Sequence, residues 1–156
     1  MKKKHVVLTT MTIILIDQLI KYVIISTMDI GEIKNLFGQV VKLHYVINTG
    51  GAFSIGHNKL FIIIILNIIL IGIIIYILAK NLNKLDRVTI IPIIMILGGG
   101  ISNLIDRLSR KSVIDYIDIN YLFKYPVFNL ADIFIVIGVI SLIILLLFRK
   151  PKEQEN

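Results

Sequence analysis

The sequence predicts an all-α membrane protein: a bundle of four transmembrane helices that carries a small extracytoplasmic β-sheet and loop cradle, with both termini in the cytoplasm. Three observations predict this fold, namely the apolar composition, four long apolar runs and the placement of the basic residues. Of the 156 residues, 56% are hydrophobic and 17% are charged, and the mean hydropathy is +0.88. A soluble domain of this size has too little interior for so many aliphatic side chains, so we expect much of the apolar surface to face lipid.

Four stretches are long and apolar enough to cross a bilayer as helices: residues 6–28, 60–79, 88–105 and 130–148. Each holds about 18 residues or more, which extends over about 27 Å at the rise of an α-helix. Helices are favoured over open strands because a strand would leave its backbone groups unpaired in hydrocarbon. We therefore expect residues 1–156 to form a single integral membrane domain with outer loops at 29–59 and 106–129.

Basic residues gather in three short segments that fall on one side of such a topology. These segments hold nine of the 17 Lys and Arg residues: Lys2, Lys3, Lys4, Lys80, Lys84, Arg87, Arg149, Lys150 and Lys152. The positive-inside rule places these segments, and with them both termini, in the cytoplasm. The net charge of +7 is thus a topology signal, and no nucleic-acid partner is expected.

The first outer loop shows a strand pattern. Apolar and polar residues alternate over residues 39–47, which predicts one strand and hence a small sheet, preceded by an amphipathic flank at about residues 30–37. The second outer loop is polar and rich in tyrosine, and it contains Pro126. No strand is predicted there.

Polar residues inside or next to the spans converge on the outer half of the membrane in this topology. Asp17 and Lys21 lie one helical turn apart on the first span, which is compatible with a packing ion pair or with direct chemistry. Asn103, Asp106 and Arg107 could cap a helix end or act in a site. Asp115 and Asp132 could be a loop carboxylate and a residue placed at a helix N-terminus, or a catalytic pair.

Elimination leaves carboxylates as the catalytic groups. The chain has no cysteine, which excludes a thiol nucleophile, and its three histidines form no H-E-x-x-H pair. Ser54 lacks the setting of a nucleophile elbow. Gly98-Gly99-Gly100 is not followed by Lys-Ser/Thr, so we interpret it as a site of close helix approach and not as a phosphate loop.

The chain resembles the lipoprotein signal peptidase (signal peptidase II) family, the membrane aspartic peptidases that process bacterial prolipoproteins. Five motifs carry the resemblance in order along nearly the whole chain: Asp17-Gln18-Leu19-Ile20-Lys21, Asn48-Thr49-Gly50-Gly51-Ala52-Phe53, Asn103-Leu104-Ile105-Asp106-Arg107, Val113-Ile114-Asp115-Tyr116-Ile117 and Phe128-Asn129-Leu130-Ala131-Asp132. Two positions depart from the usual pattern, since Gly51 replaces a commoner alanine and Ser102 replaces a usual glycine. Asp118 matches no family position.

The resemblance implies that Asp115 and Asp132 are the catalytic pair. It also implies positions that shape the site or hold the substrate: Asp17, Lys21, Asn48, Gly50, Asn103, Asp106, Arg107 and Asn129. From the residues alone, two neighbouring carboxylates share one proton, so one can accept a proton from water while the other polarises the scissile carbonyl. The sequence does not assign the two roles. Arg107 could anchor the loop or pair with Asp106.

By the same resemblance, the protein is an aspartic endopeptidase of the bacterial plasma membrane with its active site at the extracytoplasmic face. It would remove signal peptides by cleaving N-terminal to the diacylglyceryl-modified lipobox cysteine of prolipoproteins. We expect membrane lipid as its surroundings, no cofactor or metal, a monomer as the functional unit, and sensitivity to the cyclic peptide antibiotic globomycin.

Two alternative functions stay open. A Mg²⁺-dependent lipid-transfer enzyme could use Asp106, Asp115, Asp118 and Asp132 as oxygen ligands. A non-enzymatic membrane scaffold or small transporter would keep its buried charges for packing only.

Overall fold

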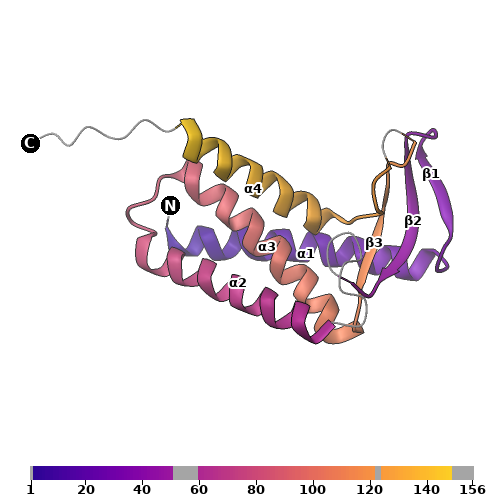
Figure 1. The fold of residues 1–156 in the computed structure, drawn as a ribbon, viewed down its shortest axis with the longest axis horizontal. Helices are drawn as coiled ribbons and strands as arrows, with labels where there is room; N and C mark the ends of the chain where they lie inside the picture. Colours follow the sequence, from indigo (N-terminus) through magenta and orange to yellow (C-terminus); the bar gives the residue numbers. More distant parts are fainter. Residues whose placement is uncertain (1, 51–59, 122–123, 149–156) are drawn as a thin grey trace, which may run out of the picture.

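The computed structural model describes residues 2–50, 60–121 and 124–148 (Figure 1). Within these ranges the chain forms four long helices and three strands: α1 (Lys3–Thr27), β1 (Ile33–Phe37), β2 (Val41–Asn48), α2 (Leu60–Asn81), α3 (Arg87–Arg110), β3 (Val113–Asp118) and α4 (Leu130–Phe148). All four helices are long and apolar enough to cross a membrane, which confirms the predicted helical bundle. Gly51, Ala52, Phe53, Ser54, His57 and the basic residues 149–152 lie outside the described residues.

Helix α3 is the centre of the bundle. It packs against α4, α1 and α2, and half of its apolar window is buried, whereas α2 and α4 bury only 11% of theirs. The start of α1, the end of α4 and the connection from α2 to α3 lie at one end, and the sheet lies at the other (Figure 1). Which side of the membrane each end faces stays a prediction.

Glycines let the helices approach closely, as predicted for the Gly98-Gly99-Gly100 run. A Cβ at Gly99 would collide with the Ala131 carbonyl oxygen of α4, and a Cβ at Gly98 would come within 2.8 Å of the Ile13 side chain of α1. A Cβ at Gly138 of α4 would likewise come within 2.7 Å of the Pro92 carbonyl oxygen of α3. Small residues at these crossings bring α1, α3 and α4 close enough for short polar side chains to bridge them.

The sheet has the strand order β1-β2-β3, and both pairings are antiparallel. Strand β2 confirms the predicted strand. The other two strands were not predicted: β1 occupies the amphipathic flank, and β3 lies in the second outer loop. Residues of β3 are buried on both faces and those of β1 are exposed on both, so neither shows the alternation that identifies a half-buried strand.

Helix α3 runs five residues past the predicted end of the third span at residue 105, so Asp106 and Arg107 lie within the helix. The extra turn is stabilised by Arg110, whose guanidinium lies 2.7 Å from the Asp106 carboxylate one turn earlier. The helix ends at Lys111, which adopts the left-handed conformation (φ 62°) and turns the chain into β3.

Candidate active site

The predicted site residues meet at the sheet end of the bundle, where α1, α3, α4 and β3 come together (Figure 1). Most are buried, and Asp17, Lys21, Asp106 and Asn129 have no exposed surface at all. Gly50 lies at the edge of the site, where its backbone N–H donates to the Asn48 side chain at 2.9 Å. Side chains brought together from separate segments therefore fill a space in which charges must be paired or hydrogen-bonded.

A buried lysine holds three of these residues together. Lys21 Nζ lies 2.8 Å from Asp17 Oδ2 and 2.8 Å from Asp106 Oδ2, with all three side chains fully buried. It also donates to Asn103 Oδ1 at 3.0 Å. Asp17 and Lys21, one helical turn apart on α1, thus form an ion pair, and the contacts of Lys21 with Asp106 and Asn103 bind α1 to α3.

Both carboxylates of this cluster accept further hydrogen bonds. Asp17 accepts from the Ala131 backbone N–H at 3.0 Å and from the Ser102 hydroxyl at 2.6 Å, which joins α1 to α4 and to α3. Asp106 accepts from Gln18 Nε2 at 3.1 Å and pairs with Arg110. We define Asp17, Lys21 and Asp106 as the ion cluster.

Arg107 does not pair with Asp106, which corrects one of the two interpretations given for it. Successive residues of a helix point in different directions, so the Arg107 side chain faces away from the ion cluster. It donates instead from Nη1 to the Asn103 carbonyl at 3.2 Å and lines a cavity next to Asp115 and Asp132. Its buried Nε has no hydrogen-bond partner among the described residues.

Asp115 is placed by the register of the sheet. It lies opposite Val46, so Asn48, two residues along β2, points to the same face. Asn48 Nδ2 donates to Asp115 Oδ2 at 2.8 Å, and Asn129 Nδ2 donates to Asp115 Oδ1 at 2.7 Å. Both oxygens of this 2% exposed carboxyl group are therefore held by neutral amides.

Asp132 is placed by the start of α4. The Asn129 side chain accepts from the Asp132 backbone N–H at 3.0 Å, and the Asp132 carboxylate accepts from the Asn129 N–H at 3.2 Å. This reciprocal arrangement has the pattern of a capping box. Asn103 Nδ2 donates to the other Asp132 oxygen at 2.8 Å. Asn129 is thus both the cap of α4 and the bridge to Asp115.

Asp115 and Asp132 line one cavity of about 260 Å³ together with Asn48 and Arg107. Burial raises the pKa of Asp115 to about 7, and the nearby charge of Asp132 adds to this effect, while the hydrogen bonds from Asn48 and Asn129 oppose it. Among the described residues, neither carboxylate makes a salt bridge. The pair is therefore poised to share a proton near neutral pH. We define Asp115 and Asp132 as the dyad.

Three contributors to the site were missed by the sequence reasoning. Gln18 donates to Ser102 and Asp106, and Ser102 donates to Asp17, so the serine at the usual glycine position adds a donor to the ion cluster. Tyr116, 3% exposed, accepts from the Leu130 N–H at 3.2 Å and so fixes the first turn of α4. The signal for Gln18 was a polar residue within an apolar run. Tyr116 follows Asp115 directly but gave no signal of its own.

Asp118 lies outside the site. Three residues beyond Asp115 on a strand, it projects from the opposite face, where its carboxylate is 3.4 Å from His44 Nδ1 and accepts from Asn120. Within the described ranges, no three His, Asp or Glu side chains are grouped so that they could hold a metal ion. Of the four aspartates named for a Mg²⁺ site, Asp106 therefore belongs to the ion cluster, Asp115 and Asp132 to the dyad, and Asp118 to the opposite face of β3.

Comparison with known proteins gives one consistent result. The family model for signal peptidase (SPase) II matches residues 9–148. The lipoprotein signal peptidase of Borrelia hermsii (strain HS1 / DAH) is 40% identical over 92% of this chain and 89% of the relative, and that of Streptococcus pyogenes serotype M2 (strain MGAS10270) is 36% identical over 94% and 95%.

Two solved structures, each described as a bacterial membrane enzyme, have the same fold. One superposes with a TM-score of 0.90 at 29% identity, covering 99% of this chain and 94% of the other, and the second with a TM-score of 0.83 at 30% identity, covering 95% and 96%. The four-helix bundle and its sheet therefore belong to a fold already seen in membrane enzymes.

Proposed function

This chain belongs to the signal peptidase II family. We therefore propose that Asp115 and Asp132 are the catalytic pair with which it hydrolyses the peptide bond that joins the signal peptide to a prolipoprotein. The observation that carries the proposal is that Asp115 and Asp132 line one cavity. Side-chain amides donate hydrogen bonds to both carboxyl groups, and among the described residues no cation forms a salt bridge with either of them. A purely structural carboxylate is normally neutralised when buried, as Asp17 and Asp106 are here.

The reaction needs one ionised and one protonated carboxyl group. Asp132 lies in the first turn of α4, where the helix dipole and two hydrogen-bond donors stabilise negative charge, so it takes a proton from the attacking water. Asp115, whose pKa is near 7, keeps its proton and gives it to the carbonyl oxygen. Water oxygen then bonds to the carbonyl carbon, which yields a tetrahedral diol. When the C–N bond breaks, Asp132 returns its proton to the leaving nitrogen and Asp115 regains one from the diol.

Arg107 completes the site on the substrate side. Its unpartnered Nε lies in a side chain that lines the dyad cavity, so it can donate to a backbone carbonyl of the bound peptide. A second, largely apolar hollow of about 220 Å³ adjoins the cavity along α4 and shares Tyr125, Phe128 and Asp132 with it. This hollow would receive part of the diacylglyceryl group while the peptide bond N-terminal to the modified cysteine reaches the dyad.

The distribution of basic residues supports a placement of the dyad at the extracytoplasmic face. Lys2, Lys3, Lys80, Lys84 and Arg87 all belong to the opposite end of the bundle, which the positive-inside rule assigns to the cytoplasm. The dyad then lies at the outer membrane boundary, where a lipid-modified cysteine can enter sideways from the bilayer. A single chain contains every group that this reaction uses.

The test is cleavage of a diacylglyceryl-modified prolipoprotein by the purified protein in detergent with EDTA present. Product with an N-terminal lipidated cysteine, identified by mass spectrometry, is expected from the wild type and from Asp118→Asn, which changes an aspartate outside the dyad. Asp115→Asn and Asp132→Asn should each lower the rate by about 10³-fold or more. Activity that is lost with EDTA, or that survives both dyad substitutions, would overturn the proposal.

A further inference from the structure

A groove lies far from the dyad, between α1 and α2 at the end of the bundle that holds the chain termini. It has a volume of about 490 Å³, and its walls come from α1 and α2, which both pack on α3. Leu97 of α3 forms part of its floor, and the short side chain of Ala79 leaves room on the α2 wall. Apart from Lys3 at one end and the hydroxyl of Thr10, its lining side chains are apolar.

The dimensions of the groove match one acyl chain in one leaflet. Its α1 wall extends from Lys3 to Ile14, which is about 16 Å along the helix axis. Half of a bilayer's hydrocarbon core is about 15 Å thick. A chain that lies in the groove would therefore reach from the membrane surface to the midplane.

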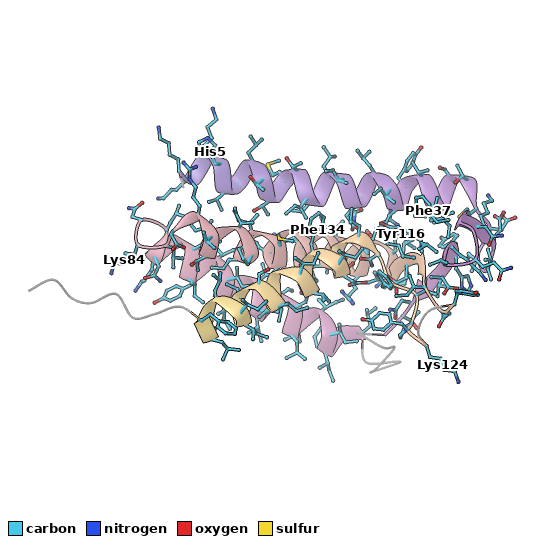
Figure 2. All side chains as sticks on the ribbon, turned by 90° about the horizontal axis from the view of Figure 1, so that it is seen from above. His5, Phe37, Lys84, Tyr116, Lys124 and Phe134 are labelled. Carbon is cyan, nitrogen blue, oxygen red and sulfur yellow. The ribbon has the colours of Figure 1, made fainter. Side chains whose placement is uncertain are left out.

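The mouth of the groove is basic. A second hollow of about 800 Å³ shares Leu82 with it and is lined by the cations Lys2 and Arg87 and by His5. No Asp or Glu lines either hollow among the described residues. Figure 2 places His5 and Lys84 at this end and Phe37 and Lys124 at the opposite one. Lys2, Lys3 and Arg87 thus line these hollows at the depth where the phosphate of a membrane lipid would lie.

We propose that this groove is a binding site for one anionic phospholipid of the leaflet at the terminal end of the bundle. One acyl chain occupies the space between α1 and α2, and the phosphate is held by Lys2, Lys3 and Arg87. A zwitterionic lipid offers the same chains but carries its own cation beside the phosphate, so it gains less from these three residues. The site is independent of the dyad, and it adds a specific lipid contact to the general lipid surroundings of the protein.

The experiment counts lipids bound to the purified full-length protein by native mass spectrometry during titration with phosphatidylglycerol or phosphatidylcholine. The double variant Lys3→Gln/Arg87→Gln removes two charges from the site. The matched variant Lys4→Gln/Lys84→Gln also removes two exposed charges from this end of the bundle, but neither residue lines either hollow. If a basic residue that lines the site contributes about fivefold to binding of the phosphate, the first variant should bind phosphatidylglycerol about 25-fold more weakly. The second should stay within twofold of wild type, because Lys4 and Lys84 line neither hollow.

The acyl chain is tested separately by filling the groove. Ala79→Phe should lower phosphatidylglycerol binding at least tenfold, whereas Ile73→Phe, at an exposed α2 position that does not line the groove, should leave it unchanged. Equal binding of the two lipids by wild type, or equal losses in the two charge variants, would overturn the proposal. The readout is lipid binding, so it does not depend on whether the dyad cleaves prolipoprotein.

Discussion

The ion cluster and the dyad each contain two aspartates and are joined by one residue, Asn103, yet they are built in opposite ways. Asp17 and Asp106 share the Lys21 ammonium at 2.8 Å, whereas Asp115 and Asp132 receive hydrogen bonds from Asn48, Asn103 and Asn129 and from backbone. Asn103 accepts from Lys21 through Oδ1 and donates to Asp132 through Nδ2.

Under the proposed function, this difference separates carboxylates that serve the structure from carboxylates that serve the reaction. A buried carboxylate that contacts an ammonium has its charge compensated, and such a pair binds helices together. Carboxyl groups held by neutral amides keep their geometry while their proton remains exchangeable, because an amide orients a carboxyl group without adding a full positive charge. Four predictions test this division, in order of decreasing effect.

Removing the shared cation should destabilise the fold more than any other single substitution in the two groups. Lys21→Met leaves Asp17 and Asp106 buried without their common partner, so we expect a loss of about 3–5 kcal/mol in stability. Thermal unfolding in detergent measures it. Lys34→Met, which breaks the largely exposed pair with Glu32, should cost at most about 1 kcal/mol. Equal losses in the two variants would mean that the ion cluster does not hold the helices.

Breaking the bridge should impair the dyad. Asn103→Ala removes the donor to Asp132 and an acceptor for Lys21, and a hydrogen bond to a charged group is worth about 1.5–3 kcal/mol, so kcat should fall about 10- to 100-fold. KM should change little, because the side chain acts on Asp132 and not on the substrate. Asn81→Ala, at the distant end of α2, is the control. A rise in KM with kcat intact would contradict this role.

The pH dependence should follow the proton on Asp115. Since its pKa is raised to about 7, kcat/KM should fall about tenfold for each pH unit above 7, measured between pH 5 and 9. The folded chain binds this proton more tightly than the unfolded chain, where the pKa is near 3.8, so the stability due to it is lost as the pH rises from about 4 to 7.

The melting temperature of the wild type should therefore decline relative to that of Asp115→Asn over this interval. A constant difference between the two proteins from pH 4 to 7, or an unchanged rate up to pH 9, would show that Asp115 is not the proton carrier.

The smallest effect is expected at Ser102, whose hydroxyl donates to Asp17 from a fully buried position. Ser102→Ala should lower stability by about 1–2 kcal/mol, because one acceptor of the ion cluster loses a donor. Ser109→Ala, on the same helix, removes an exposed hydroxyl that donates only to backbone carbonyls of its own helix and should change stability by less than about 0.5 kcal/mol. Chemical unfolding of the two variants side by side makes the comparison.

Features that one residue type is sufficient to define could be predicted from the sequence. Long apolar runs predicted the helices, and the Gly98-Gly99-Gly100 run predicted a close approach that Gly98 and Gly99 both show. Features that depend on partner residues could not be predicted in this way. The strand β3 was not predicted, because burial on both faces removes alternation, and the end of α3 was placed too early, because its last turn is stabilised by an ion pair between Asp106 and Arg110.

Hydrophobicity and residue type are local properties, so the sequence was sufficient to predict the four long apolar helices, and it indicated carboxylates as candidate reactive groups. The tertiary structure was needed to distinguish the aspartates that are neutralised from those that share a cavity. Asp106, Asp115 and Asp132 have the same side chain, and their positions in the sequence do not indicate that Asp106 lies 2.8 Å from Lys21 while the other two line one cavity. The crossing of α1, α3 and α4 at their glycines and the register of β2 on β3 set those distances, and distance and burial determine what a carboxyl group can do.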